Sequence, residues 1–277
     1  MIICNDATGQ LSNRLCVAQH ALALAIERKE TIVFTELDFA KRLYKCTPPS
    51  GIKVIFKKSW FWRFERQTIG RMVDWMIARM PPAAGDRNRC LRAFGLTIVS
   101  GWVQLRADRA CWKHHDEICA FFRPKFLDER KDAVESLLSR TKPNVGIHIR
   151  RRDYRDWNGG KYFFSDDVYA RIMRDIEKEI DAHFIVFHDE PVEMEHYKGL
   201  DCVCSNGTPV EDHWFMSKCD YLVGPPSTFT GWASFYGKVP VATITSPTVR
   251  LSLKDLVQRT GRSDCSVSGS SKVFPGK

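Results

Sequence analysis

The sequence lacks a long apolar run and a leader pattern. Its most apolar stretches, ALALAI at 21–26 and HFIVFH at 183–188, fall well short of the roughly 18 apolar residues that span a bilayer. The opening MIICNDATGQ includes Asp6 and has no basic region followed by an apolar stretch. The sequence therefore predicts neither an integral membrane segment nor a secretory signal.

Four motifs that would point to particular kinds of site are also missing. The ten cysteines include no C-x-x-C pair, and no cysteine and histidine cluster has zinc-ligand spacing. No G-x-x-x-x-G-K-S/T loop occurs, which argues against an ATP-dependent kinase or NTPase. No D-x-D occurs either, although enzymes that hold a nucleotide sugar through a divalent ion commonly carry one. We interpret the cysteines as buried apolar residues in a reducing compartment, in preference to disulfides.

Acidic residues are outnumbered by basic ones. The chain has 42 Lys and Arg against 33 Asp and Glu, a net charge of +9, and this excess attracts nucleic acid, an anionic membrane surface or a small phosphorylated substrate. Within 57–82 an apolar stripe is surrounded by basic residues. Such a segment either lies on an anionic bilayer or packs on its own domain, and we favour packing.

What the sequence does contain is an alternation of short apolar runs and helix-like segments. The predicted strands are 1–4, 31–34, 145–149, 184–187, 221–224 and 239–244, and the predicted helices are 12–29, 165–180, 209–219 and 227–237. This order predicts an α/β architecture with parallel sheets. The pattern occurs once on each side of a middle region, so we expect domains at 1–142 and 143–277 with a cleft between them.

The stretch VGIHIRRRDY at 145–154 follows a predicted strand with His148, Arg150, Arg151, Arg152 and Asp153. Ligands of open α/β sheets bind outside the carboxyl ends of the strands. Guanidinium groups offer fixed, charged, bidentate donors that suit phosphate, so a pair of them would hold a diphosphate. An isolated run of three arginines could equally be a solvated surface strand, and that alternative stays open for this run alone.

Two further segments end predicted strands with polar groups. In GPPSTFTGWASFYG at 224–237, Ser227, Thr228 and Thr230 stand where a helix begins, and free N–H groups there form an anion site. Ordinary helix capping by Ser227 or Thr228 is the alternative. In FIVFHDE, Asp189 and Glu190 follow a strand. Acids in that place can accept hydrogen bonds from a base or a ribose, and capping of the loop is the alternative.

Five segments, in the same order, resemble the glycosyltransferase family 11 fucosyltransferases, which make alpha-1,2 linkages and are relatives of the alpha-1,6 and protein O-fucosyltransferases. The segments are GQLSNRLCVAQHALALA at 9–25, SGWVQLRADRACWKHHDEICAFFRPK at 100–125, the H-x-R-R-x-D match at 148–153, FHDE at 187–190, and EDHWFMSKCDYLVGPPSTFTGWASFYG at 211–237. Each segment alone is modest evidence, and the five in register are specific.

The resemblance implies a GT-B-like fold of two Rossmann-type domains that face each other across a cleft. It also implies an inverting transfer of L-fucose from GDP-fucose to a glycan hydroxyl, most simply alpha-1,2 to galactose, without a cofactor or a metal ion. Domain 1–142, with a helical insertion, would be the acceptor side, and domain 143–277 would bind the nucleotide sugar.

The family's roles carry over residue by residue. Arg150 and Arg151 would serve the diphosphate, His148 and Asp189 the guanine, Ser227, Thr228 and Phe229 the phosphate loop, and Gly9 and Asn13 the facing loop. The general base is not identified: Asp6 and Asp153 are candidates by proximity, and for Asp153 we favour pairing with a neighbouring arginine. Loss of Arg151 is expected to lower the rate by roughly ten- to a hundredfold or more, because charged hydrogen bonds to the leaving GDP matter most in the transition state.

The chain also departs from the family pattern. Gln10 and Ser12 replace usual glycines, and Arg14 replaces a glutamine. A silent GDP-sugar-binding protein of the same fold is therefore the alternative function, and a nucleic-acid-binding protein is a weaker one, because no nucleic-acid motif is present. We expect a cytoplasmic protein and leave open a peripheral membrane contact through 57–82. The histidines at 114–115 are expected at the surface.

Overall fold

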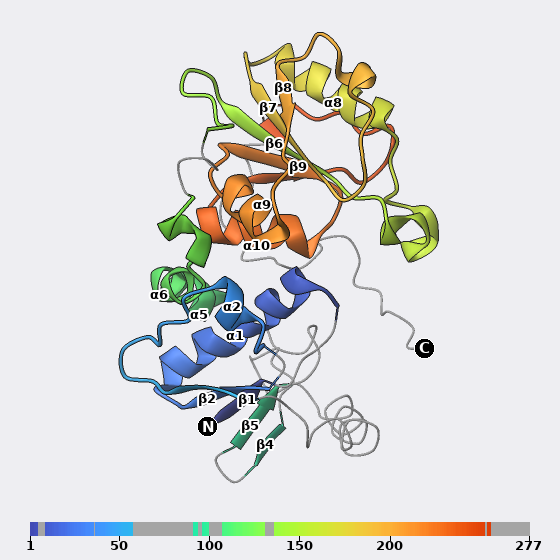
Figure 1. Ribbon diagram of the computed structural model, residues 1–277. Helices are drawn as coiled ribbons and strands as arrows, with labels where there is room; N and C mark the ends of the chain where they lie inside the picture. The colour runs from blue at the N-terminus through green and yellow to red at the C-terminus, as the bar shows by residue number, and fades with distance from the viewer. Residues whose placement is uncertain are drawn as a thin grey trace. The chain divides into compact units, whose positions relative to one another are not determined.

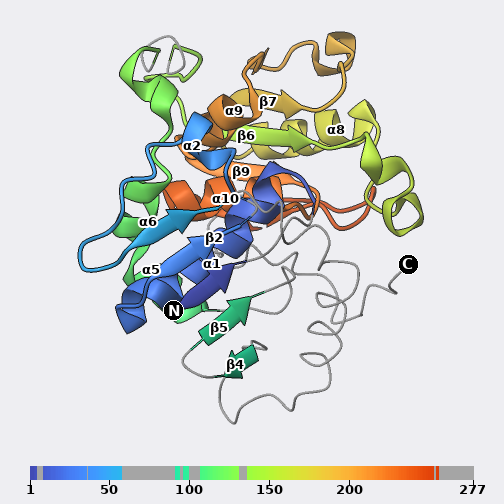
Figure 2. The ribbon, with the colours of Figure 1, turned by 60° about the horizontal axis from the view of Figure 1, so that its bottom comes forward.

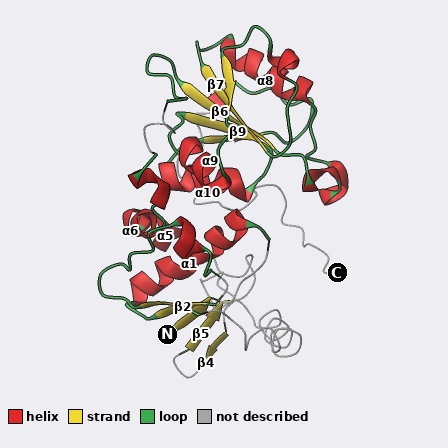
Figure 3. Ribbon diagram, in the orientation of Figure 1, coloured by secondary structure: helices red, strands yellow, loops and turns green. Residues whose placement is uncertain are grey.

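The structure is a computed structural model that describes two α/β units. The described residues are 1–4, 9–35, 37–57, 91–93, 96–99, 107–130, 136–252 and 254–255. The chain divides into Met1–Lys125 and Phe126–Lys277, called unit 1 and unit 2 below. Each unit contains a sheet and helices packed on it (Figure 3).

Unit 1 is built on a five-stranded sheet in the order β3-β2-β1-β5-β4. Its elements are β1 (Ile2–Cys4), α1 (Leu11–Arg28), β2 (Ile32–Phe34), α2 (Ala40–Leu43), β3 (Val54–Phe56), β4 (Leu91–Ala93), β5 (Leu96–Val99), α5 (Asp108–Lys113) and α6 (His115–Phe121). Strands β1, β2, β3 and β5 are parallel, and β4 is antiparallel to β5. The predicted first β-α-β unit is confirmed, because Leu15, Ala18, Leu22 and Ala25 of α1 are all buried.

The two histidines at the start of α6, His114 and His115, correct one prediction. His115 is only 7% exposed, so the expectation of a surface residue is wrong for it. Its ring stacks on Trp112 at a centroid distance of 5.6 Å, and its Nδ1 lies 2.9 Å from Oδ1 of Asp116. A polar tip with a partner allows the rest of the imidazole ring to be buried.

Unit 2 has a five-stranded sheet in the order β10-β9-β6-β7-β8, in which every pair is parallel. Its strands are β6 (Asn144–Ile149), β7 (His183–His188), β8 (Cys202–Cys204), β9 (Tyr221–Gly224) and β10 (Val241–Thr243); its helices are α8 (Asp166–Glu177), α9 (Pro209–Met216) and α10 (Thr228–Gly237). All of these elements were expected from the sequence, in which Cys202 and Cys204 also fall in a predicted strand. Ser165 takes the predicted N-cap position of α8, but its side chain makes no capping hydrogen bond.

The two faces of the unit 2 sheet carry separate cores. Val145, Ile147 and Ile149 of β6 pack with α8, whereas Phe215 of α9 and Ala233 of α10 pack on the opposite face. Figure 1 shows α8 on one side of this sheet and α9 and α10 on the other. Because side chains alternate along a strand, the intervening His148 belongs to the face that α9 and α10 cover. The period-2 pattern of VGIHI thus decides which helices His148 can contact.

The strand order of unit 2 reverses next to β6. The chain runs from β6 outward through β7 to β8 and then returns to the other side of β6 with β9 and β10. The arrows of β6 and β7 point the same way (Figure 2), so their carboxyl ends share one edge. Ligands of such sheets bind outside the carboxyl ends where the strand order reverses, which here is between β6 and β9.

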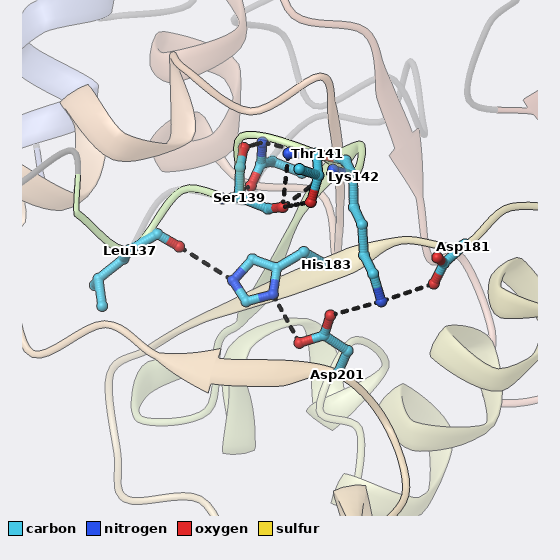
Figure 4. A network of polar contacts seen from close by, with 8 residues as sticks. Leu137, Ser139, Thr141, Lys142, Asp181, His183 and Asp201 are labelled. Atoms are coloured by element: carbon cyan, nitrogen blue, oxygen red, sulfur yellow. Dashed lines mark hydrogen bonds and ion pairs between the residues drawn. The ribbon is translucent and has the colours of Figure 1, made fainter.

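The segment that precedes β6 belongs to unit 2. Leu137 and Leu138 pack on the core that α9 and α10 form with the sheet of unit 2. Nε2 of His183 lies 3.1 Å from the Leu137 carbonyl oxygen (Figure 4). Lys142 pairs with Asp181 at 2.8 Å and Asp201 at 3.0 Å, and hydrogen bonds to these carboxylates raise the pKa of Lys142. The division between the units therefore lies before the boundary at 142/143 that the sequence predicts.

Gly237, the last residue of α10, is packed against backbone. A Cβ at this position would lie 2.1 Å from the carbonyl oxygen of Ser217, and a backbone group cannot turn aside. Gly237→Ala is expected to lower the free energy of unfolding by about 2–4 kcal/mol, measured by urea titration. Gly199→Ala is the control: its Cβ would meet open space at a φ of +87°, so it should cost only about 1 kcal/mol of backbone strain. Equal costs for the two variants would contradict the steric explanation.

Candidate functional site

His148 joins strand β6 to helix α10. It is 4% exposed, and its Nδ1 lies 2.7 Å from Oγ1 of Thr230. A Cβ on Gly224 would lie 3.0 Å from the Cβ and from the backbone oxygen of His148, so a side chain at this position would crowd β6. Burial, with repulsion from Arg150, lowers the pKa of His148 to about 3. The imidazole is therefore neutral near pH 7 and offers one donor and one acceptor.

Phe229 lies between two buried histidines. Its ring centroid is 5.1 Å from that of His148 and 3.9 Å from that of His213 on α9. Burial also lowers the pKa of His213 to about 3, with a smaller contribution from His148. The three rings make a neutral cluster that links α9 and the start of α10 to the end of β6.

Arg150 follows β6 and is held by two carboxylates. Its Nη2 lies 2.6 Å from Oδ1 of Asp153, and its Nη1 lies 3.1 Å from Oδ2 of Asp189. The guanidinium also lies over the ring of Tyr154, 5.8 Å from its centroid. The preferred interpretation of Asp153 as a partner of a neighbouring arginine is consistent with this pair. Arg150 keeps a side-chain exposure of 16%, so an anion can reach it.

Arg151 is more deeply buried and has a carboxylate of its own. It is 8% exposed, and its Nη2 lies 2.7 Å from Oδ1 of Asp166. Its backbone N–H donates to Oδ1 of Asp189 at 2.8 Å. Asp189 therefore binds the backbone of one arginine and the side chain of the other, so it fixes the conformation of the whole arginine segment.

The start of α10 lies next to the arginine segment. Ser227 is the N-cap, and its hydroxyl accepts the N–H of Phe229 at 3.1 Å. The hydroxyl of Tyr154 donates to the carbonyl oxygen of Pro226, and burial raises the pKa of Tyr154 to about 12. Thr228 begins the helix, and the N–H groups of a first helical turn attract anions. The arginine segment and the start of α10, which the sequence predicts to bind phosphate, are thus joined by hydrogen bonds.

Asp212, on α9, is a residue to which the sequence analysis gave no role. It is 8% exposed, and Oγ of Ser205 donates to its Oδ1 at 2.5 Å. No cation pairs with it within the described part of the chain, and burial, with repulsion from Glu211, raises its pKa to about 7. Its neighbour Glu211 instead pairs with Arg130 and closes a capping box with Thr208. Only the E-D pair at 211–212 could have drawn attention to Asp212, and acids are common in first helical turns.

The remaining predicted residues lie in unit 1 or outside the described residues. Gly9 has a φ of +71°, and a Cβ there would fall 1.9 Å from Nδ2 of Asn13. Gly9 and Asn13 are therefore in contact, and the loop accepts only glycine at position 9. Asp6 lies outside the described residues, as does almost all of the basic segment 57–82.

Among the residues that the structure describes, no group of three or more His, Cys, Asp and Glu side chains is placed to hold a metal ion. No described helix combines the length and the apolar character needed to cross a bilayer. Cys46, Cys202, Cys204 and Cys219 are free thiols.

Comparison with known proteins gives a family and a fold. Residues 99–253 match the family model described as Glycosyl transferase family 11, and no curated protein matched. The fucosyltransferase NodZ from Bradyrhizobium superposes with a TM-score of 0.58 over 90% of this chain and 96% of that one, at 12% identity.

Two further solved structures have the same fold. NodZ alpha-1,6-fucosyltransferase soaked with GDP-fucose superposes with a TM-score of 0.57 at 12% identity, over 88% of this chain and 94% of that one. Arabidopsis thaliana FUT1 in complex with GDP gives 0.53 at 10% identity, over 87% of this chain and 69% of that one. These similarities confirm an α/β fold of the GT-B-like class.

Proposed function

The chain belongs to glycosyltransferase family 11, and on that premise we propose that it transfers L-fucose from GDP-fucose to a hydroxyl of a glycan, with inversion at the anomeric carbon. One observation carries the proposal. At the point where the strand order of unit 2 reverses, Tyr154 and His148 fasten the arginine segment to the start of α10. The guanidinium of Arg150 and a helix N-terminus then lie close to the edge where a diphosphate would bind, and Arg151 follows Arg150 in the chain.

The donor diphosphate is assigned to Arg150, Arg151 and the start of α10. Arg150 is paired with two carboxylates and partly exposed, so a diphosphate can replace Asp153 as its partner. The hydroxyls of Ser227 and Thr228 lie at the start of α10, where they would donate to the phosphate oxygens. The N–H of Phe229 donates to the Ser227 hydroxyl, so a phosphate oxygen would have to replace that contact. These groups would offset the negative charge that grows on GDP as the glycosidic bond breaks.

For the guanine we propose His148 and Asp212, with Asp212 in the place first expected for Asp189. Oδ1 of Asp189 accepts the backbone N–H of Arg151, and Oδ2 forms an ion pair, without a hydrogen bond, with Arg150. Asp212 is buried without a cationic partner among the described residues, and a buried carboxylate of this kind is costly unless something donates to it. Guanine presents two adjacent N–H donors on its pyrimidine ring, and no other common base presents this pair.

The chemistry that the chain's own residues support is stabilisation of the leaving group. Metal-independent transfer remains our proposal, supported by the missing D-x-D and by the arginines. The general base is left unassigned: Asp153 is ion-paired with Arg150, and Asp6 lies outside the described residues.

Two further proposals concern the unit that binds the acceptor and the cellular location of the protein. We propose unit 1, with the Gly9 and Asn13 loop, as the acceptor side, and a galactose hydroxyl with alpha-1,2 linkage as the target, because the sequence resembles enzymes of that specificity. The free thiols of Cys46, Cys202, Cys204 and Cys219 are compatible with a cytoplasmic location, since reducing compartments keep thiols unpaired.

A ligand screen tests the donor. GDP and GDP-fucose at a hundredfold excess over their dissociation constants are expected to raise the stability by about 2.7 kcal/mol, measured as a rise in Tm, and UDP-sugars are expected to give no rise. Stabilisation by a UDP-sugar but not by GDP would refute the assignment. GDP release that a galactoside stimulates would support the transferase, whereas tight GDP binding without turnover would support the silent binder.

A further inference from the structure

Asp166 is a buried carboxylate that holds the guanidinium of Arg151. It is the first residue of α8 and is 7% exposed. Its Oδ1 lies 2.7 Å from Nη2 of Arg151 and accepts a hydrogen bond of 2.5 Å from the hydroxyl of Tyr197. Tyr197 comes from a 3-10 helix at Met194–Tyr197. Three segments that are separate in the sequence therefore meet at one carboxylate oxygen.

The surroundings leave the Arg151 side chain little freedom. Arg151 is 8% exposed and Tyr197 is 1% exposed, and Asp189 holds the backbone N–H of Arg151. Nε and Nη2 of Arg151 are both buried and make no hydrogen bond to a described residue, so Nη2 is held by its ion pair with Asp166. A planar guanidinium that is anchored at one nitrogen keeps its other N–H groups in a fixed direction. Arg151 is thus oriented in advance and retains unused donor capacity.

Asp175, a second carboxylate on α8, forms ion pairs with side chains that are exposed to solvent. Asp175 pairs with Arg250 at 2.6 Å and with Lys178 at 3.2 Å, and those partners are 68% and 72% exposed. The pair of Asp166 and Arg151, in contrast, is buried on both sides. Burying two charges costs desolvation free energy that apolar residues would avoid. The cost is understandable if the fixed guanidinium serves a ligand.

We propose that Asp166 and Tyr197 are positioning residues for the donor diphosphate. They hold Arg151 in the orientation in which it binds the phosphate oxygens, and they contact neither the donor nor the acceptor. Tyr197 acts through Asp166, because its hydroxyl keeps the carboxylate oriented toward Arg151. The inference rests on the proposed function and assigns to it two residues outside the recognised motifs.

The test compares GDP with guanosine, which lacks the diphosphate. Asp166→Asn is expected to weaken GDP binding about tenfold and Tyr197→Phe about threefold, measured by titration calorimetry on the full chain. Both variants should bind guanosine as the unchanged protein does, measured by saturation-transfer NMR. Asp175→Asn is the matched control, because it removes ion pairs from the same helix and should leave GDP affinity within about twofold.

A double-mutant cycle shows whether Asp166 acts through Arg151. In an Arg151→Met background, Asp166→Asn should change the GDP dissociation constant by less than about twofold, because the group that it positions is gone. Equal effects of Asp166→Asn in both backgrounds would mean that Asp166 acts independently, and would overturn the inference.

The remaining outcomes separate this inference from the proposed function. Unchanged GDP affinity in both single variants, or equal losses for GDP and guanosine, overturns the inference alone. An unchanged protein that binds no GDP overturns the proposed function as well. If Asp166→Asn does not fold, Tyr197→Phe removes a single hydroxyl and decides the question by the same comparison.

Discussion

Asp212→Asn is expected to weaken GDP binding at least tenfold and, at the same time, to make the protein more stable at pH 8. Both effects have one cause, because the Asp212 carboxylate is buried with a hydroxyl partner and no cationic one among the described residues. Its ionised form costs free energy until a ligand donates to it. A charged hydrogen bond to guanine contributes about 1.5–3 kcal/mol, which corresponds to the tenfold loss or more.

The sign of the pH dependence follows from the raised pKa. Burial moves the pKa of Asp212 from 3.8 to about 7, so between these values the folded protein binds a proton that the unfolded chain has released. The free energy of unfolding therefore falls as the pH rises from 4 to 7. A shift of about 3 units at ~1.4 kcal/mol each limits the penalty to about 4 kcal/mol. Asp212→Asn should recover part of this, roughly 2–4 kcal/mol at pH 8, and almost none at pH 4.

Binding has the opposite dependence, since guanine needs the ionised carboxylate. Relative to Asp212→Asn, the unchanged protein should lose about tenfold in GDP affinity between pH 8 and pH 6. Titration of the diphosphate affects both proteins and cancels in this ratio. Unfolding curves and calorimetry at the two pH values measure the two effects.

The neighbouring Glu211 supplies the control. Glu211→Gln removes the pair with Arg130 and weakens the cap at Thr208, so it should lower the Tm and leave GDP affinity within about twofold. A loss of stability at pH 8 in Asp212→Asn, or unchanged GDP affinity, would contradict the proposed role of Asp212.

The sequence predicted the parallel α/β architecture because its signals are local. Val145, Ile147 and Ile149 alternate in a strand, and the apolar face of α1 repeats at helical spacing. These patterns depend on neighbours in the chain, which a sequence displays directly. The same is true of the arginine segment and the start of α10, because both follow strands whose carboxyl ends share an edge.

These local patterns do not predict which segments that are distant in the chain will contact each other. Asp166 and Tyr197 meet Arg151 only after α8 and the segment before β8 are packed, and neither residue belongs to a recognised motif. Asp212 was hidden for a different reason, because an acid in a first helical turn is ordinarily a favourable, solvated group. Its role depends on burial, which the sequence does not display. His115 was misjudged in the same way.

Arg150→Met is expected to lower kcat/KM for GDP-fucose at least a hundredfold. The substitution removes a guanidinium that faces the leaving diphosphate and also frees Asp153 and Asp189 from their partner. Two charged hydrogen bonds at about 1.5–3 kcal/mol each are lost, and two bare carboxylates then repel the phosphates. At about 1.4 kcal/mol for each factor of ten, the loss amounts to a hundredfold or more.

This repulsion distinguishes Arg150 from a simple charge on the surface. Arg152→Met removes the same charge from an exposed neighbour and should leave kcat/KM within about threefold, because a screened surface charge contributes little. Arg150→Met combined with Asp153→Asn should recover part of the loss, since the bare carboxylate nearest to the missing guanidinium is then neutral. If Arg150→Met and Arg152→Met lose equal activity in initial-rate measurements, the arginines act only through overall charge, and the assignment of Arg150 to the diphosphate is wrong. If the double variant is less active than Arg150→Met, Asp153 contributes to the reaction itself and is more than a partner of Arg150.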